Sequence, residues 1–154
     1  MLELVKYLHL LTMIVAVTAA VIPGLVLLVI ARRRDVAALR GLAPLAISAR
    51  GFAAPLFVLG AIFGLAATVA ARAAPMRPWL IASYVAFILA LLTGAILGDP
   101  WARQVGRAAV ESPGDTPSPE MEAAIRDRRG TIASAVMVGS VAVLIFLAAI
   151  KPGG

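Results

Sequence analysis

The residues of this sequence that could bind a cofactor lie near its amino-terminal end. His9 is the only histidine among 154 residues, and Met13 follows it one helical turn later. An imidazole and a thioether in this arrangement could ligate a haem iron or Cu(I). The alternative is that His9 hydrogen-bonds a neighbouring backbone carbonyl while Met13 only packs. A single histidine cannot supply a bis-histidine haem site within one chain, so either reading leaves the cofactor unknown.

The rest of the sequence is dominated by four apolar stretches, over residues 7–30, 51–71, 79–98 and 131–150. Each has about 20 residues or more, the length at which an α-helix crosses a hydrocarbon core of about 30 Å. Hydrophobic residues make up 62% of the chain and charged residues 14%, against about 25% charged residues in soluble domains. The sequence therefore predicts an all-α polytopic membrane protein, a single four-helix transmembrane bundle over 1–154.

Basic residues gather in the two predicted loops 31–50 and 99–130. Of 14 basic residues these loops hold ten, which are Arg32, Arg33, Arg34, Arg40, Arg50, Arg103, Arg107, Arg126, Arg128 and Arg129. The positive-inside rule places such loops in the cytoplasm, so we expect a multi-pass protein of a bacterial cytoplasmic (inner) membrane with both termini outside. We expect the arginines to contact lipid headgroups. This placement argues against nucleic acid as a partner, although the net charge is +6.

Reactive side chains are scarce within the predicted spans. The three ranges 51–71, 79–98 and 131–150 contain no charged residue, and the chain has no cysteine. Charged groups inside membrane spans usually mark ion pathways, and hydrolytic sites need paired carboxylates or a serine–histidine–aspartate set. The pattern therefore argues against a proton-coupled transporter, a channel monomer and a hydrolase. Without cysteine, disulfides and thiol catalysis are excluded.

Small residues recur at four-residue spacing in three spans, which lets helix backbones approach closely in lipid. These residues are Gly60, Gly64, Ala82, Ala86, Ala90, Gly94, Gly98, Ala135 and Gly139. We expect the span 79–98 to be the most tightly packed helix, crossing 51–71 or a second copy of itself. Trp79 and Trp101 bracket this span about 33 Å apart along a helix, which predicts one indole at each headgroup level.

The segment 99–130 is the only long polar stretch. Ser118 followed by Pro119 is typical of a helix start, with acidic residues in the next turn and arginines in the last. The sequence predicts a short cytoplasmic helix over 119–129. A surface helix over 35–42 is expected in the first cytoplasmic loop.

Short motifs in this sequence carry a family resemblance. They are Lys6–Leu11 at the start of the first span, Asp35–Arg40, Pro55 with Gly64, and Ile150–Gly153. The chain resembles a bacterial family of predicted four-helix integral membrane proteins, which is related to the copper-resistance protein D-like (CopD-like) membrane domains and distantly to HemJ-type protoporphyrinogen oxidases. The resemblance implies that His9 matches the first-helix histidine of the haem- and copper-associated relatives. The third-helix lysine of HemJ-type enzymes has no counterpart here.

Two functional hypotheses of different classes follow. The first is a non-enzymatic packing or accessory component of the inner membrane, acting as a homo-oligomer or with a membrane partner subunit. The alternative is a haem- or copper-binding membrane protein in redox chemistry or copper handling, with His9 as ligand and Met13 as a candidate second ligand. A third hypothesis is a carrier of a small uncharged solute or lipid, built around helix kinks at Pro23 and Pro55.

Overall fold

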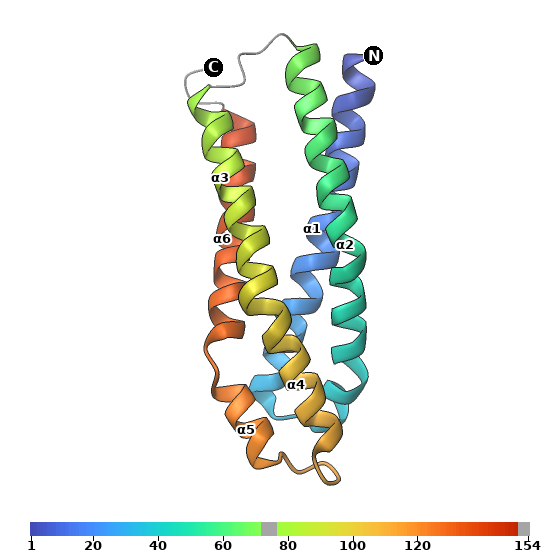
Figure 1. The fold of residues 1–154 in the computed structure, drawn as a ribbon, viewed down its shortest axis with the longest axis vertical. Helices are drawn as coiled ribbons and strands as arrows, with labels where there is room; N and C mark the ends of the chain where they lie inside the picture. Colours follow the sequence, from blue (N-terminus) through green and yellow to red (C-terminus); the bar gives the residue numbers. More distant parts are fainter. Residues whose placement is uncertain (72–76, 151–154) are drawn as a thin grey trace.

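The computed structural model describes residues 1–71 and 77–150, and every regular element among them is helical (Figure 1). The elements are α1 (Leu2–Arg33), α2 (Val36–Ala70), α3 (Pro78–Thr93), the π-helical segment η1 (Gly94–Gly98), α4 (Asp99–Glu111), α5 (Pro119–Arg126) and α6 (Arg129–Ile150). Four helical stretches among them are long and apolar enough to cross a membrane. The predicted fold class, an all-α four-helix bundle, is confirmed.

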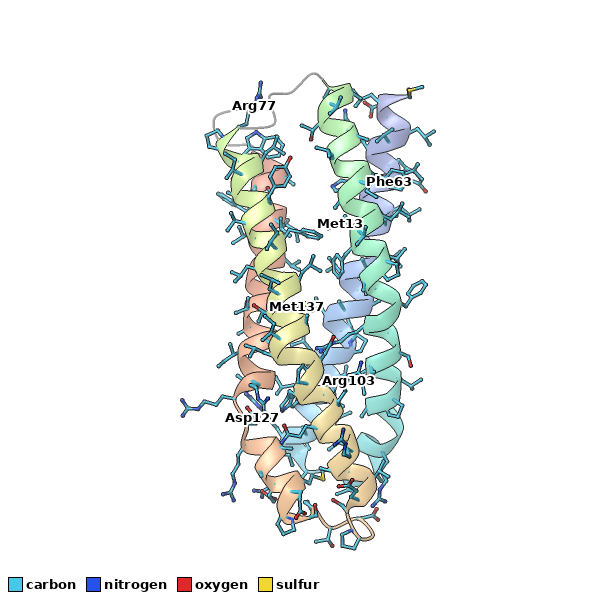
Figure 2. All side chains as sticks on the ribbon, viewed as in Figure 1. Met13, Phe63, Arg77, Arg103, Asp127 and Met137 are labelled. Carbon is cyan, nitrogen blue, oxygen red and sulfur yellow. The ribbon has the colours of Figure 1, made fainter. Side chains whose placement is uncertain are left out.

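Two antiparallel helix pairs build the bundle. Figure 1 shows α1 beside α2 and α3 beside α6, with α4 and α5 below them. We call the end formed by the α1–α2 turn, α4 and α5 the basic end, and the opposite end, where α1 begins and α6 finishes, the terminal end. Figure 2 shows Arg103 and Asp127 at the basic end and Arg77 at the terminal end. Met13 and Met137 project into the space between the two pairs.

Helix α2 is much longer than its predicted span. The sequence predicts a loop over 31–50 that contains a surface helix over 35–42. The helix is confirmed, but its predicted end before the span is wrong, because α2 begins at Val36 and continues to Ala70. Its start is fixed by Asp35, whose Oδ1 accepts a hydrogen bond from the Ala38 backbone N–H at 2.9 Å. Pro44 and Pro55 both lie inside the helix. Each lacks a backbone N–H, and such losses are tolerated in helices that neighbouring helices support.

The polar segment 99–130 is also largely helical. Helix α4 follows α3 and η1 without a break, so the third long helix runs from Pro78 to Glu111. The predicted short helix begins where expected, with Ser118 Oγ accepting from the Met121 N–H at 3.2 Å. It ends at Arg126 rather than Arg129, because α6 begins at Arg129.

The largest buried cluster lies at the basic end and not in the middle of the spans. Its large members are Leu27, Leu39, Trp101, Val105 and Met121, all 0–1% exposed. Helix α4 is amphipathic: it turns one face onto α1, α2 and α5 and leaves the other face exposed. Burial of this apolar face holds the basic end together.

Trp101 is a core residue, so its indole does not face the headgroups as an aromatic-belt residue would. Its side chain is 1% exposed, and its Nε1–H donates to the Ala124 carbonyl at 3.1 Å. The indole lies directly on the α-carbon of Gly130. The helical length from Trp79 is right, but α4 turns Trp101 inward. Trp79 is half-buried at the start of α3.

Within the spans, buried positions hold mainly small residues. Ala16 and Ala20 of α1, Ala53 of α2, Ala86 of α3 and Ala133 of α6 are all at most 8% exposed. Large apolar residues point outward instead, where lipid replaces water as the surrounding medium. This distribution is typical of membrane bundles, whose helices gain little by exchanging lipid contacts for apolar contacts with each other.

We predict that Gly130→Ala destabilises the protein by about 2 kcal/mol through overpacking. The added methyl group would overlap the Trp101 indole, which α5 and α6 enclose. Thermal unfolding in detergent, followed by tryptophan fluorescence, measures the effect. Gly41→Ala is the matched control, because a Cβ atom there meets nothing within 4 Å. Equal melting temperatures for the two variants would contradict the role given to Gly130.

Candidate functional site

His9 lies against α2, in a trough made by two glycines. Its Nδ1 is 2.8 Å from the Gly60 carbonyl oxygen. A Cβ atom built on Gly64 would lie 2.9 Å from His9 Cε1, and one built on Gly60 would lie 2.6 Å from the Met13 sulfur. The two glycines therefore give His9 and Met13 room to pack on the α2 backbone. Gly60 and Gly64 serve the α1–α2 contact rather than the predicted crossing with the third span.

The hydrogen bond to Gly60 decides the chemistry that His9 offers. Because a carbonyl oxygen only accepts, Nδ1 must carry the proton, which leaves the Nε2 lone pair available. Metal-ligating histidines usually show this arrangement. Met13, however, is packed on Gly60, and the described residues contain no group of three or more histidine, cysteine, aspartate and glutamate side chains that could hold a metal. His9 could supply one ligand to haem or copper, and no such group among the described residues would complete the set.

A second polar site lies where the two helix pairs meet near the basic end. Arg50 of α2 pairs with Asp99 of α4, with 2.8 Å between Arg50 Nη1 and Asp99 Oδ1. The Arg50 side chain is only 11% exposed, and that of Asp99 is 41% exposed. Arg50 Nε is buried and has no hydrogen-bond partner within the described residues. The pair therefore joins α2 to the helix that follows α3.

Two glycines make space for the Arg50 guanidinium. A Cβ atom on Gly24 would lie 2.6 Å from Nη2, and one on Gly98 would lie 2.8 Å from Nη1. Gly24 follows Pro23 inside α1, and Gly98 is the last residue of η1, directly before Asp99. The sequence predicts a loop at Arg50, so this pair was not predicted. The only hint in the sequence is the two glycines, Gly24 beside Pro23 and Gly98 beside Asp99.

Arginine side chains also order the basic end. Arg40 caps the carboxyl end of α4: its Nε–H donates to the Ala109 carbonyl at 2.8 Å, and Nη2 donates to the carbonyls of Ser112 and Gly114. At the start of α6, the backbone N–H of Arg129 donates to Asp127 at 2.9 Å. This hydrogen bond lowers the pKa of the Asp127 carboxyl below its ordinary value.

The predicted interface arginines have different surroundings. Arg34 pairs with Glu122 at 2.9 Å, and Arg32 donates to the Thr131 hydroxyl at 3.2 Å. Arg33 is exposed at the end of α1. These three residues therefore lie on the surface of the basic end, and Arg32 and Arg34 also tie the end of α1 to α6 and α5. Their predicted contact with lipid headgroups stays a prediction.

The small residues of α3 and α6 divide into a buried and an exposed group. Ala86, Gly94 and Gly98 are buried and Ala90 is half-buried. Their side of the helix meets α6, where a Cβ atom on Gly94 would lie 3.1 Å from Met137 Cε. The expected close crossing of this helix is therefore with α6, and not with α2.

The exposed group consists of Ala82 on α3 and of Ala135 and Gly139 on α6. A Cβ atom on Gly139 would meet nothing within 4 Å. These positions lie on the outer surface of the bundle.

The interior between the helix pairs is apolar and nearly filled. A cavity of about 20 Å³ lies at mid-span between the two pairs, with Met13, Phe57, Phe87, Met137 and Leu144 among the residues that line it. This volume is about that needed for one water molecule. The Phe57 and Phe87 rings meet edge to face across it, 5.8 Å apart. In this state the bundle has no room for a solute larger than water at that level.

We predict an asymmetric response to breaking the Arg50–Asp99 pair. Asp99→Ala leaves a buried cation without its partner and should cost about 3 kcal/mol of stability. Arg50→Met keeps apolar packing and leaves Asp99, which is partly exposed, to water, so it should cost less than about 1 kcal/mol. Thermal unfolding of each variant measures these values. The double variant should be more stable than Asp99→Ala alone, and additive losses would contradict the pairing.

Comparison with known proteins finds no match: no family model, no curated protein and no solved structure is significantly similar to this chain. The resemblance to CopD-like membrane domains and HemJ-type proteins therefore stays a prediction. Of the residues that carry it, those after Ile150 lie outside the described part of the chain.

Proposed function

We propose that this protein is a non-enzymatic component of the bacterial inner membrane that assembles with a second copy of itself or with a partner subunit through the exposed face of α6. The observation that carries the proposal is the pair Ala135 and Gly139, which are one turn apart and exposed. Small residues in a membrane helix allow close approach of another helix. A Cβ atom on Gly139 would meet nothing within 4 Å inside the bundle, whereas one on Gly94 or Gly98 of η1 would meet a side chain.

The orientation follows from the arginines. Ten arginines lie in the segments 31–50 and 99–130. The side chains of Arg40 and Arg50 are held by the contacts described above, and the other eight arginines surround the basic end. The terminal end has few basic residues. The positive-inside rule then puts the basic end in the cytoplasm and the beginning of α1 outside. In this orientation α6 presents Ala135 and Gly139 in the cytoplasmic half of the membrane, where a partner helix would contact them.

We predict that Gly139→Leu, alone and with Ala135→Leu, lowers the oligomeric state or releases a co-purifying subunit without lowering the melting temperature. The leucines would hold a partner helix away but would meet nothing inside the bundle. Size-exclusion chromatography with light scattering, in mild detergent, gives the mass of the assembly. Ala66→Leu on α2 is the control, since this alanine is also exposed.

Gly94→Leu separates internal packing from assembly. Gly94 faces Met137, so a leucine there should lower the melting temperature through internal strain. Assembly through this face of α6 is contradicted if the Gly139→Leu assembly has the same mass as the wild-type assembly. It is also contradicted if the wild type is a monomer without a partner.

The second candidate function is haem or copper binding, and one observation favours it. The Gly60 carbonyl holds the proton on His9 Nδ1, which leaves Nε2 free to ligate. Bound haem or copper would supply one-electron chemistry or Cu(I) transfer. His9 would hold the group, and Met13 would need to leave Gly60 to become the second ligand. A chain with one histidine would bind bis-histidine haem only between two copies.

The test is the absorption spectrum and metal content of protein expressed with haem and copper supplied. A Soret band or stoichiometric copper that is lost in His9→Gln supports the second candidate. The glutamine amide keeps a donor for Gly60, so a loss of stability does not explain the result. A colourless, metal-free wild type counts against the second candidate and leaves the first one standing.

A further inference from the structure

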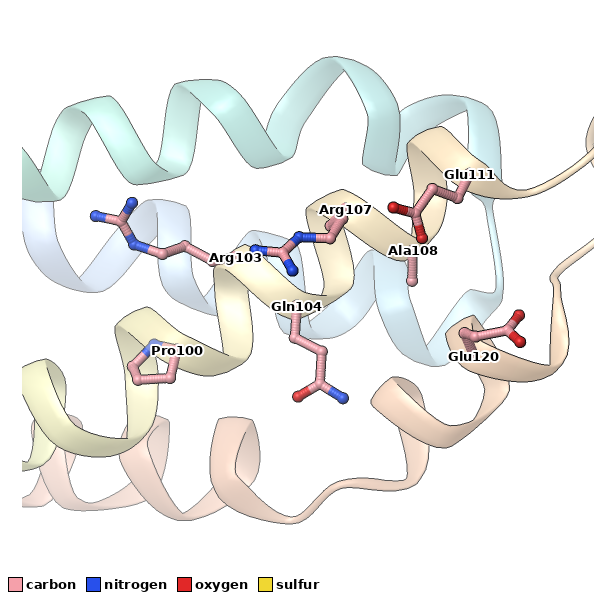
Figure 3. Close-up of a pocket in the computed structure, with 7 residues that line it drawn as sticks. All are labelled: Pro100, Arg103, Gln104, Arg107, Ala108, Glu111 and Glu120. Carbon is pink, nitrogen blue, oxygen red and sulfur yellow. The ribbon is translucent and has the colours of Figure 1, made fainter.

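A groove on the basic end lies between α4 and α5. Figure 3 shows its lining, which consists of Pro100, Arg103, Gln104, Arg107, Ala108, Glu111 and Glu120. The cavity has a volume of about 370 Å³ and opens to the surroundings. Six of these residues belong to α4, and Glu120 belongs to the first turn of α5. The groove takes no part in the His9 site, in the Arg50–Asp99 pair or in the face of α6 proposed for assembly.

The charges in the groove are separated along its length. Arg103 and Arg107 lie one turn apart on the exposed face of α4, nearer the span. Glu111 follows one turn after Arg107, and Glu120 lies at the same far end. Within residues 1–71 and 77–150, no salt bridge joins Arg103 or Arg107 to a carboxylate. The two guanidinium groups are thus available to an outside anion, and the two carboxylates to an outside cation.

Gln104 lines the groove on a different side of α4 from the two guanidinium groups (Figure 3). Its Oε1 accepts from Arg129 Nη2 at 3.2 Å, so the side-chain carbonyl is engaged and the NH₂ group remains a donor. A phosphate group between Arg103 and Arg107 can receive hydrogen bonds from two guanidinium groups. Charged hydrogen bonds of arginine to phosphate are among the stronger polar contacts in proteins.

The groove begins where the apolar span ends. Pro100 lines it, and Asp99 directly precedes Pro100 at the end of the apolar helix. Ile96, about one turn earlier, is 63% exposed, and Leu92 is 52% exposed. A molecule with its charged part in the groove would therefore have an apolar surface beside it for acyl chains.

We propose that the groove binds the headgroup of a phosphoethanolamine lipid, with the phosphate at Arg103 and Arg107 and the ammonium at Glu111 and Glu120. The sign and order of the charges match this zwitterion, because the phosphate of a lipid lies nearer the membrane than its ammonium. A purely anionic headgroup would satisfy the arginines but would meet the two carboxylates. A quaternary choline would offer the carboxylates no hydrogen-bond donor.

The test is titration of the purified protein in detergent with short-chain phosphatidylethanolamine, phosphatidylglycerol and phosphatidylcholine, with bound lipid counted by native mass spectrometry. Phosphatidylethanolamine should bind with the highest affinity. Arg103→Gln with Arg107→Gln should weaken that binding tenfold or more, since each basic residue near a headgroup contributes about fivefold. Arg33→Gln with Arg128→Gln is the matched control, because both residues are exposed at the same end and lie outside the groove.

The carboxylates and the source of the ligand are tested separately. Glu111→Gln with Glu120→Gln should abolish the preference for phosphatidylethanolamine over phosphatidylglycerol and leave Arg-dependent binding of both lipids. Soluble phosphoethanolamine and inorganic phosphate should bind much more weakly than the lipid.

Three results would overturn the proposal. They are an equal loss of binding in the control pair, a preference of the wild type for phosphatidylglycerol, and binding of soluble phosphoethanolamine or of phosphate as tight as that of the lipid. The first would mean that only overall charge matters, the second that the carboxylates do not select, and the third that the ligand is not a lipid. None of these results depends on whether α6 mediates assembly.

Discussion

Lipid surrounds most of this molecule, and apolar side chains gain little there by leaving lipid for each other. The two helix pairs must therefore be held together by something other than the hydrophobic effect along their spans. Polar contacts and water-driven burial at the basic end fill this role. Arg50 reaches from α2 to Asp99 at the start of α4, and the apolar face of α4 closes over α1 and α2. Small residues in the spans then allow the helices above this junction to approach.

The junction needs three places where a small residue makes room for a large side chain. Pro23 and Gly24 open space in α1 for a guanidinium group. The π-helical turn of η1 ends at Gly98, and the next residue is Asp99. Gly130 gives the Trp101 indole a flat surface on α6. At each place a glycine lies against a large polar or aromatic side chain, and none of these contacts tolerates an added methyl group without movement.

The sequence predicts the fold class because spans of about 20 apolar residues have no other stable form in a bilayer. It predicts the start of α5 from Ser118 and Pro119, which act locally. It also predicts a helix near Asp35, but as a separate surface helix over 35–42, since arginines and Pro44 suggest that it ends before the span. That α2 continues through Pro44 to Ala70 depends on support from neighbouring helices, which the sequence does not show. Trp101 illustrates the same difficulty. Its spacing from Trp79 fits an interface position, and only the direction in which α4 turns decides that the indole is buried.

The sequence predicts only part of the candidate site at His9. The single histidine and the glycines of α2 are visible in the sequence. Their contact, however, joins residues 9 and 60, and the periodicity of one helix does not show which other helix packs against it. The Arg50–Asp99 pair and the groove at Arg103 and Arg107 are likewise products of tertiary contact. Function in this protein is therefore best sought at helix junctions and at the basic end rather than along the span interiors.

The position of the main core has a consequence for how the molecule loses its structure. Trp101, Val105 and Met121 are buried among helices at the arginine-bearing end, where exclusion of water stabilises the packing, whereas the spans keep their backbone hydrogen bonds because lipid offers no alternative. Urea acts by solvating apolar and peptide groups, so it reaches the basic end before the spans. Unfolding in urea accordingly has two stages. The packing of α4 and α5 at the basic end is lost first, while the membrane helices remain helical.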